Sequence, residues 1–341
     1  MRGETGHQAA VLGAGSWGTA LAVHLGSVGH RVSLWGRDRA LIAEMSARRA
    51  NPTYLPDVRF PDPVLPVAEI ETALAGAHHV IVAIPSHGLR GVMQAAAPAL
   101  PRGAVLISAT KGIEEGSLQR MSEVIAEETG GRHPVVVLSG PSFAAEVARQ
   151  LPTALVAASL DEAAVAAVQQ EFRGPAFRLY GSDDVVGVEI GAALKNIIAI
   201  AAGVTESMSL GHNAMSALIT RGLAEISRLA CAMGGRRESL AGLSGLGDLV
   251  LTCTGALSRN RHVGLELGRG RSLDEILAGM KMVAEGVRTT SAALALGERY
   301  QVELPIACQM AEVLAGRKTP RAAVGNLMLR PQRDEHDGAG S

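Results

Sequence analysis

The chain has 341 residues, which is enough for two domains with separate hydrophobic cores. Its 32 Lys and Arg residues nearly balance its 33 Asp and Glu residues, so no overall field favours nucleic acid or an acidic membrane surface. The charge balance therefore favours a soluble protein that acts on small molecules and binds no nucleic acid.

Hydrophobic residues make up 47% of the chain and aromatic residues only 3%, which is typical of packed helices and parallel strands. The three cysteines, Cys231, Cys253 and Cys308, are far apart and odd in number, so we predict a reducing compartment, no disulfide framework and no metal site. Residues 1–9 lack the apolar segment of a signal peptide. We find no apolar run of the roughly 18 residues that a membrane span requires. A cytoplasmic protein is expected.

The first apolar run leads into a glycine motif. Residues 10–12 are followed by Gly13-Ala14-Gly15-Ser16-Trp17-Gly18, a G-x-G-x-x-G pattern. Between a strand and a helix, this pattern places backbone N–H groups and the positive end of the helix dipole against a pyrophosphate. Residues 19–28 continue as a helix closed by Gly29, and residues 31–35 form a second strand. This context favours dinucleotide binding over a turn that serves only packing.

The end of the second strand indicates which dinucleotide is bound. An acidic side chain at this point holds the ribose 2′-hydroxyl of NAD, whereas an arginine accommodates the 2′-phosphate of NADP. The strand runs into Gly36-Arg37-Asp38-Arg39. Arg37 therefore favours NADP, while Asp38 leaves NAD open. The alternative is that both are solvated charges at the start of a helix.

Further strands are predicted over residues 79–84, 104–108, 135–139, 153–158 and 177–180, with a helix over residues 118–128. This alternation predicts a doubly wound parallel sheet, which binds ligands beyond the carboxyl ends of its strands. The exits at residues 84–86, 109–112 and 139–142 are candidate site loops. Lys111 in the second exit is placed to meet a phosphate or a reacting oxygen, unless it is a solvated loop lysine.

From Gly181 onward the pattern becomes helical, with no convincing strand. We therefore predict a dinucleotide-binding domain over residues 1–180 and an all-helical domain over residues 181–330. The polar residues 331–341 are expected to form a disordered tail. The Ala-rich helices are compatible with a homodimer.

Lys195 lies in an apolar helical stretch whose positions three and four residues away are Gly191, Ala192, Ile198 and Ala199. The helix itself therefore offers no carboxylate partner. A buried lysine has a lowered pKa and exchanges protons near neutral pH. The alternative is a lysine whose stem crosses an apolar face while its amine reaches water.

Two later segments carry further candidates. Asp248 ends a glycine-rich loop, where it caps the following helix or orients the catalytic lysine. Ser258 is a predicted N-cap, so free backbone N–H groups, Arg259 and Asn260 are placed to converge on one phosphate. Basic residues at a helix start are unfavourable and call for an anion or an acidic partner.

Taken together, these segments resemble NAD(P)-dependent glycerol-3-phosphate dehydrogenase of the bacterial type. The matching motifs run in order over residues 10 to about 290: GAGSWGTA at residues 13–20, NPTYLP at 51–56, TKG at 110–112, SGPSFA at 139–144, LKN at 194–196, GLGD at 245–248 and SRN at 258–260. That family has an N-terminal Rossmann domain and an all-helical C-terminal domain. The resemblance covers nearly the whole chain.

The resemblance implies a site and a reaction. It implies Lys195 as the proton acceptor for the C2 hydroxyl of sn-glycerol 3-phosphate. The implied substrate site comprises Lys111, Gly140, Ser142, Lys195, Asp248, Ser258, Arg259 and Asn260. The implied dinucleotide contacts are Ser16, Trp17, Arg37, Lys111, Ala144, Arg259, Val283 and Glu285, in addition to Gly13, Gly15 and Gly18 of the glycine motif.

The resulting hypothesis is reversible hydride transfer between NAD(P)H and dihydroxyacetone phosphate, giving sn-glycerol 3-phosphate for glycerophospholipid synthesis. Lys195 exchanges the proton, Asp248 orients Lys195, and the helix start at residues 258–260 holds the phosphate. One alternative is a β-hydroxyacid dehydrogenase, which also pairs a Rossmann domain with a helical domain carrying a lysine. The other is a dinucleotide-sensing module without chemistry.

Overall fold

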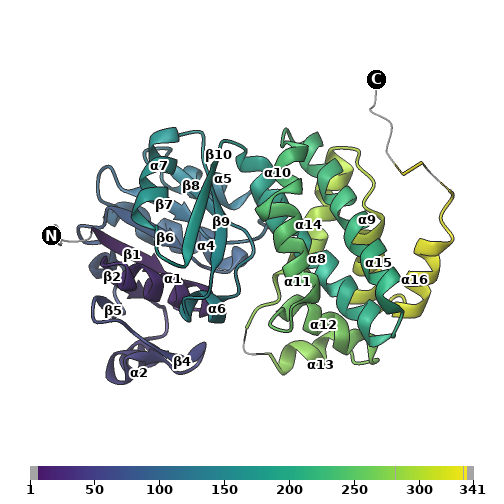
Figure 1. Ribbon diagram of the computed structural model, residues 1–341, viewed down its shortest axis with the longest axis horizontal. Helices are drawn as coiled ribbons and strands as arrows, with labels where there is room; N and C mark the ends of the chain where they lie inside the picture. The colour runs from purple at the N-terminus through teal and green to yellow at the C-terminus, as the bar shows by residue number, and fades with distance from the viewer. Residues whose placement is uncertain (1–6, 281, 333, 336–341) are drawn as a thin grey trace.

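The computed structural model describes residues 7–280, 282–332 and 334–335. Its amino-terminal part is an eight-stranded sheet and its carboxyl-terminal part a layer of helices beside that sheet (Figure 1). The strand order across the sheet is β10 (Phe177–Ser182), β9 (Thr153–Ala158), β8 (Val135–Ser139), β7 (Val105–Ser108), β6 (His79–Val82), β1 (Gln8–Leu12), β2 (Arg31–Trp35) and β5 (Val64–Val67). From β1 the chain first adds β2 and β5 on one side, and then adds β6 and β7 on the other side of β1. A doubly wound fold binds its ligand at the point where the strand order reverses in this way.

Both faces of the sheet are covered, which explains why its strands are almost entirely apolar. Along β1, Val11 packs into the core on one face and Leu12 into the core on the other. The first core includes side chains of α1 (Ser16–Ser27), α2 (Arg39–Arg48), α6 (Ala144–Ala148) and α7 (Glu162–Glu171). The second includes side chains of α3 (Ile70–Leu74), α4 (Ser86–Ala96) and α5 (Met121–Glu128).

The expectation of a parallel sheet is wrong at one pairing, because β9 runs antiparallel to β8. All other pairings in this sheet are parallel. Between β8 and β9 the chain forms only the five-residue α6. At about 1.5 Å per residue such a helix is shorter than the strands, so it does not carry the chain back across the sheet. The chain therefore re-enters the sheet from the edge at which it left.

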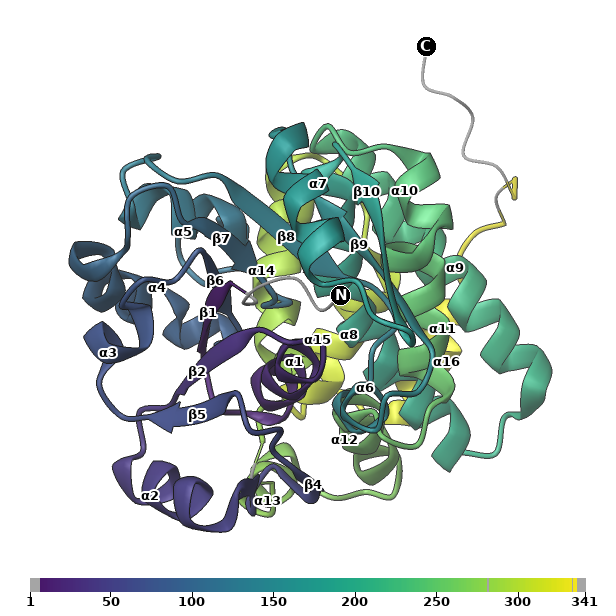
Figure 2. The same cartoon turned by 60° about the vertical axis from the view of Figure 1, so that its left-hand side comes forward.

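The structure also contains elements that we did not predict. A small antiparallel pair, β3 (Ala50–Asn51) and β4 (Leu55–Arg59), lies with α2 beside the β5 edge of the sheet (Figure 2). The predicted strand over residues 79–84 ends at Val82, and the predicted helix over residues 118–128 begins at Met121. The strand predicted over residues 177–180 extends to Ser182.

The described residues after Ser182 contain helices and no strand, as expected. The helices are α8 (Val185–Ser207), α9 (Gly211–Ala232), α10 (Arg237–Ala241), α11 (Asp248–Thr254), α12 (Arg259–Gly268), α13 (Leu273–Ala278), α14 (Glu285–Arg299), α15 (Pro305–Leu314) and α16 (Pro320–Met328). A π-helical turn, Leu243–Gly247, precedes α11. The division of the chain at residue 180 into two domains stays a prediction. Most of the tail predicted over residues 331–341 lies outside the described residues.

The central helix of this part corrects one expectation. By length and composition α8 qualifies as a membrane-spanning helix, although we expected no such run. Its small apolar residues outweigh its two central charges, Glu189 and Lys195. The helix is buried inside the helical layer, which explains its composition without a membrane.

Candidate active site

Two lysines from distant parts of the chain meet on one buried carboxylate. The Nζ atom of Lys195 lies 2.5 Å from Oδ1 of Asp248, and the Nζ atom of Lys111 lies 2.7 Å from Oδ2. Lys195 is 5% exposed and Asp248 1% exposed. Lys195 is therefore a buried lysine, and the alternative of an amine that reaches water is wrong.

The secondary structure explains this geometry. Lys195 lies in the middle of α8, and Asp248 is the first residue of α11, directly after the π-helical turn. The N-cap of α11 is Gly247, and Asp248 is the first residue inside the helix. Its carboxylate faces the two lysines, so the capping alternative is wrong. π-Helical turns inside helical segments often occur at functional sites, because they redirect side chains.

Lys195 has a second partner that the sequence analysis missed. Its Nζ atom donates to Oγ1 of Thr252 at 2.8 Å, one turn along α11 from Asp248. The Thr252 hydroxyl in turn donates to the backbone oxygen of Asp248 at 2.6 Å. An ammonium group has three N–H donors. With two of them directed at Asp248 and Thr252, the third is available to a substrate oxygen.

The electrostatics of the cluster suit proton transfer. Burial lowers the pKa of Lys195 to about 7, with the Lys111 charge acting in the same direction and Asp248 against it. Burial acts to raise the pKa of Asp248, but the Lys111 and Lys195 charges outweigh it and hold this pKa below the ordinary value. The nearby Cys253 thiol has a pKa raised to about 12 by burial and stays protonated. The cluster therefore joins a titrating lysine to a carboxylate that is ionised at neutral pH.

Lys111 comes from the sheet, and its neighbours are other predicted site residues. It follows β7, and its Nζ atom also donates to the backbone oxygen of Gly140 at 3.0 Å. The Ser142 hydroxyl donates to the same oxygen at 3.0 Å. The exits of β7 and β8 thus meet α11 of the helical part, and this brings together five of the predicted substrate residues.

The glycine motif has the shape of a dinucleotide cradle. A Cβ atom on Gly18 would collide with the backbone of Gly13. Gly13 has a φ of +118°, and a Cβ atom there would collide with the backbone oxygen of Ala83. These two glycines are required by packing. Gly15 is different, because among the described residues, apart from Gly15 itself and its two chain neighbours, no atom lies within 4 Å of the position its Cβ would take. The space it leaves and the uncapped start of α1 fit a pyrophosphate.

Trp17, in the same motif, has a buried indole N–H for which the described residues offer no hydrogen-bond partner. A buried donor of this kind is costly unless a ligand or water accepts from it. The side chain of Ser16 is engaged on two sides, because its hydroxyl donates to the backbone oxygen of Tyr54 at 3.0 Å and lies 3.1 Å from Sδ of Met282. Met282 is next to Val283, so this contact places the helical part of the chain beside the glycine motif.

Asn51 holds the glycine motif from the other side. Its side chain is fully buried and its Nδ2 atom donates to the backbone oxygen of Ala14 and to Oγ1 of Thr19, both at 2.8 Å. Its Oδ1 atom accepts from the backbone N–H of Tyr54 at 3.1 Å. The motif at residues 51–56 therefore supports the glycine loop, a role that its sequence did not reveal.

At the end of β2 the two candidate charges differ. The Asp38 carboxylate caps α2 by accepting from the backbone N–H groups of Ala40 and Leu41 at 3.0 and 3.1 Å. Arg37 is exposed. Its neighbour Arg39 pairs with Glu69 at 2.5 Å. The helix-start alternative therefore holds for Asp38, and Arg37 remains the candidate contact for a dinucleotide.

The start of α12 lies against the helix that carries Glu285. Ser258 is the N-cap, as predicted, and accepts from the backbone N–H of Arg261. The Asn260 side chain donates to Oδ1 of Asn196 and accepts from the backbone N–H of Gly286, both at 2.9 Å. Desolvation lowers the pKa of Arg259, and the charge of Glu285 acts against this. Asn196, which the sequence analysis left without a role, links this helix start to Lys195.

Glu285 connects the helical part to the sheet. Its carboxylate accepts from the backbone N–H of Ser86 at 3.0 Å and from the Ser86 hydroxyl at 2.6 Å. Ser86 is the first residue of α4, so the Glu285 carboxylate lies at the N-terminus of α4, where the helix dipole favours a negative charge. This place is beside the exit of β6. Arg261 shows a related effect, because Glu206 is the acidic partner that its position at a helix start requires.

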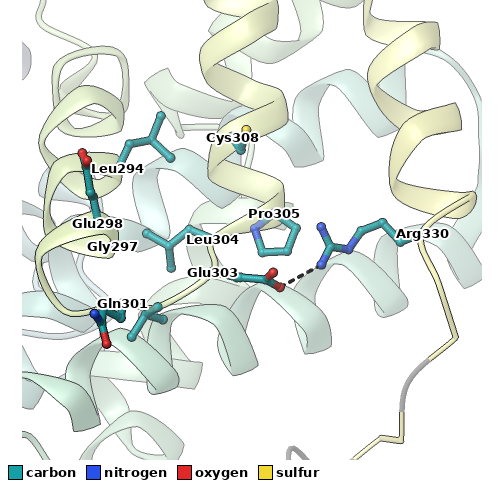
Figure 3. Close-up of a pocket in the computed structure, with 10 residues that line it drawn as sticks. Leu294, Gly297, Glu298, Gln301, Glu303, Leu304, Pro305, Cys308 and Arg330 are labelled. Atoms are coloured by element: carbon teal, nitrogen blue, oxygen red, sulfur yellow. Dashed lines mark hydrogen bonds and ion pairs between the residues drawn. The ribbon is translucent and has the colours of Figure 1, made fainter.

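A pocket of about 390 Å³ lies elsewhere, between α14 and α15 (Figure 3). Leu294, Leu304, Pro305 and Cys308 line it, and an ion pair of Glu303 and Arg330 at 3.0 Å borders it. None of the predicted site residues lines this pocket. The candidate site is therefore the Lys111, Asp248 and Lys195 cluster with the glycine motif.

Comparison with family models identifies both parts of the chain. Residues 8–165 match the N-terminal model of NAD-dependent glycerol-3-phosphate dehydrogenase, and residues 184–325 match its C-terminal model. The chain belongs to this family. The resemblance of the motifs is thereby confirmed, and so is the assignment of the chain to the NAD(P)-dependent oxidoreductases.

Individual relatives agree. The chain is 54% identical over 265 residues to a protein named glycerol-3-phosphate dehydrogenase [NAD(P)+] from Thioalkalivibrio sulfidiphilus, covering 78% of this chain and 80% of the relative. It is 52% identical over 270 residues to a protein of the same name from Koribacter versatilis, with the same coverage. The crystal structure of glycerol-3-phosphate dehydrogenase from Coxiella burnetii superposes with a TM-score of 0.92 at 40% identity, over 95% of this chain and 99% of that one. The predicted fold class, a Rossmann-like sheet domain followed by helices, is confirmed.

Proposed function

We propose that this protein catalyses the reversible reduction of dihydroxyacetone phosphate to sn-glycerol 3-phosphate with NADH or NADPH. The observation that carries the proposal is the buried Lys195, which has a pKa of about 7. Its amine is held between Asp248 and Thr252, beyond the carboxyl ends of β7 and β8. Membership of the family supports the substrate and the cofactor. A sensing module needs no titrating buried lysine, so the geometry favours catalysis over sensing.

Lys195 moves the proton. A bound nicotinamide supplies the hydride in the direction of reduction and accepts it in the direction of oxidation. The Lys195 ammonium gives a proton to the ketone oxygen during reduction, and the neutral amine takes it back from the C2 hydroxyl during oxidation. Asp248 and Thr252 hold the nitrogen so that the third N–H of the ammonium, or the lone pair of the neutral amine, faces the substrate.

The phosphate of the substrate is assigned to the start of α12. Free backbone N–H groups of that helix, the Arg259 guanidinium and the Asn260 amide supply donors, and Ser258 caps the helix. Lys111, Gly140 and Ser142 complete the substrate site from the sheet side. Binding energy from the phosphate then aligns the reacting carbon with Lys195.

The dinucleotide is assigned to the carboxyl end of β1, where the glycine motif faces the helical part. Its contacts are Gly13, Gly15, Ser16, Trp17, Gly18, Arg37, Lys111, Ala144, Arg259, Val283 and Glu285. Because Asp38 is used as a helix cap while Arg37 is exposed, we favour NADPH over NADH.

One assay tests the reaction. Oxidation of NADH and of NADPH is followed by absorbance after addition of dihydroxyacetone phosphate, with dihydroxyacetone and a β-keto acid as comparison substrates. We expect turnover with the phosphorylated ketone and little with the others. Turnover of the β-keto acid alone would support the β-hydroxyacid alternative, and no turnover with any substrate would support a sensing module.

The variant Lys195→Met tests the role of the lysine. We expect turnover to fall by a factor of about 10² to 10⁴, the range typical of a lost general acid, while NADH binding stays within about twofold. Lys318→Met, at a position outside the site, is the matched control. Near-normal turnover of Lys195→Met would remove Lys195 from the mechanism.

The cellular setting is also a proposal. We propose a cytoplasmic homodimer: the three free cysteines support a reducing compartment, and the Ala-rich helices support self-association. Sedimentation equilibrium of the full chain tests the dimer, and fractionation of the source cells tests the location.

A further inference from the structure

A second buried carboxylate, outside the catalytic cluster, joins the helical part to the sheet. Glu189 of α8 is 4% exposed. Its carboxylate accepts from the backbone N–H of Ser122 at 2.8 Å, from the Ser122 hydroxyl at 2.6 Å and from Nη1 of Arg120 at 2.7 Å. Ser122 lies in the first turn of α5, so a side chain of one part caps a helix of the other. Because the burial of a carboxylate is costly, this arrangement calls for a reason.

The chain between Lys111 and Arg120 gives that reason. This segment, residues 111–120, begins three residues after the end of β7 and reaches the N-cap of α5 at Arg120. A bridge between Ile113 and Arg120 ties its two ends together. Ile113 and Leu118 pack into the core of the helical part, although the segment belongs to the sheet part in sequence. Asp248 holds the beginning of the segment and Glu189 holds its end.

We propose that Glu189 is a positioning residue: it anchors the segment 111–120 to α8 and so sets the place of Lys111 relative to Asp248 and Lys195. This inference rests on the proposed function. Glu189 and Lys195 are six residues apart on one helix, about 9 Å along its axis. The anchor and the catalytic amine therefore move as one body, and Lys111 is fixed to that body at both ends of its segment.

Loss of the anchor has two consequences for chemistry. Lys111 gains freedom to leave Asp248, and misplacement of an active-site group by about 1 Å is sufficient for a large loss of rate. The charged and titratable groups facing Lys195 are Asp248 and Cys253 of α11 and Lys111. The charge of Lys111 helps to lower the pKa of Lys195, so its withdrawal raises that pKa.

The test is Glu189→Gln in the full chain, which keeps the size of the side chain and removes its charge. Trace acetylation at fixed pH, read by mass spectrometry, reports how accessible the Lys111 amine is. We expect labelling of Lys111 to rise about threefold or more, kcat/KM for reduction to fall about tenfold, and its pH midpoint to move upward by about half a unit. Because Lys111 is also one of the proposed dinucleotide contacts, NADH affinity is expected to fall in parallel with the rise in Lys111 labelling.

Glu225→Gln is the matched control. Glu225 is also a buried carboxylate on a helix and also caps another helix, because it accepts from the backbone N–H groups of Ile306 and Ala307 at 2.8 and 2.9 Å. We expect it to lower thermal stability without changing Lys111 labelling or the pH midpoint. Ser122→Ala is a milder test of the Glu189 anchor if Glu189→Gln does not fold, and a smaller change in the same direction is expected.

The outcomes separate this inference from the proposed function. If the folded anchor variants keep wild-type Lys111 labelling and the wild-type pH midpoint, Glu189 serves only to stabilise α5 and the inference is overturned. The labelling needs no turnover, so it decides the anchor independently of the reaction. A wild-type protein that does not reduce dihydroxyacetone phosphate contradicts the proposed function, whatever the labelling shows.

Discussion

At the scale of single residues, the shifted pKa of Lys195 gives a testable pH dependence. Its ordinary value of 10.5 is lowered to about 7, mainly by burial. Reduction uses the ammonium form, so kcat/KM for dihydroxyacetone phosphate should fall as pH rises through about 7. Oxidation uses the neutral amine, so kcat/KM for sn-glycerol 3-phosphate should rise over the same range.

Initial rates in both directions, from about pH 5.5 to about pH 9, measure this dependence. This range brackets the midpoint that we expect near pH 7. The falling curve for reduction and the rising curve for oxidation should have the same midpoint, because Lys195 serves as the acid in one direction and as the base in the other. An oxidation rate that still rises steeply near the ordinary lysine value would show that Lys195 is not desolvated in solution.

Arg37 allows a second prediction at this scale. Its side chain is exposed to solvent, where it can meet a 2′-phosphate, whereas the Asp38 carboxylate caps the start of α2. We expect Arg37→Ser to weaken NADPH binding by a factor of about ten and to leave NADH binding nearly unchanged, since a charge-assisted contact contributes about 1.5–3 kcal/mol. Fluorescence titration with both dinucleotides measures this. Equal weakening of both would assign Arg37 to structure and not to cofactor choice.

At the scale of elements, the hairpin of β3 and β4 supports the glycine motif through Asn51. The amide of Asn51 donates to the backbone of Ala14 and to Thr19. A carboxylate in its place retains the acceptor for Tyr54 but meets the Ala14 oxygen without a donor, which costs roughly 1–3 kcal/mol. We therefore expect Asn51→Asp to weaken dinucleotide binding about tenfold or more, while kcat at saturation stays near the wild-type value.

Titration at low and high salt separates this effect from simple repulsion of the dinucleotide by the new charge, which salt screens. Thr19→Val removes one of the two acceptors without adding charge, and a smaller loss of affinity is expected. Unchanged affinity in Asn51→Asp, with a lower melting temperature, would show that the hairpin only stabilises the fold.

The same elements show how far sequence patterns reach. Strands such as β2 and β8 were predicted with their bounds, because apolar residues bounded by turn signals mark buried parallel strands. The pair β3 and β4 was missed, since two and five residues with polar and proline content carry no periodic signal. The direction of β9 was also missed, because it depends on the length of α6 and not on the strand itself.

The site was predictable to a similar degree. Lys195 stood out because its own helix offers no partner, yet sequence could not decide its burial. That depends on Asp248 and Thr252, 53 and 57 positions away, which only folding brings to its amine. Glu189 gave no signal at all, since its partners Arg120 and Ser122 lie at the start of α5, in the other part of the chain.

At the scale of the whole molecule, the proposed catalytic cluster and the buried histidine His79 lie at opposite ends of the strands. The cluster of Lys111, Asp248 and Lys195 is at the carboxyl ends. At the amino-terminal ends, His79 opens β6, with His7, His78, His30 and the carboxylate of Glu171 around it. Burial lowers the pKa of His79 to about 4, with the other histidines acting in the same direction and Glu171 against it. We therefore expect His79 to affect the stability of the fold rather than the reaction.

The consequence is a pH-dependent stability with a defined sign. His79 has an ordinary pKa of 6.5 in the unfolded chain and about 4 in the folded one, so the unfolded state binds more protons between these values. Its contribution is fully present above pH 6.5 and is lost as pH falls toward 4. A difference of this size corresponds to at most about 3 kcal/mol.

Urea unfolding tests this contribution. The free energy of unfolding is measured for the wild type and for His79→Gln at about pH 7.5, above the ordinary pKa of His79, and at about pH 4.5, where most of its contribution is lost. A glutamine side chain does not titrate, so the variant should lose less stability between the two pH values than the wild type, whatever the substitution costs at neutral pH. His212→Gln, at an exposed position, should lose as much as the wild type. If His79→Gln loses the same amount as both, the acid sensitivity originates elsewhere, and His79 is protonated in the folded protein at little cost.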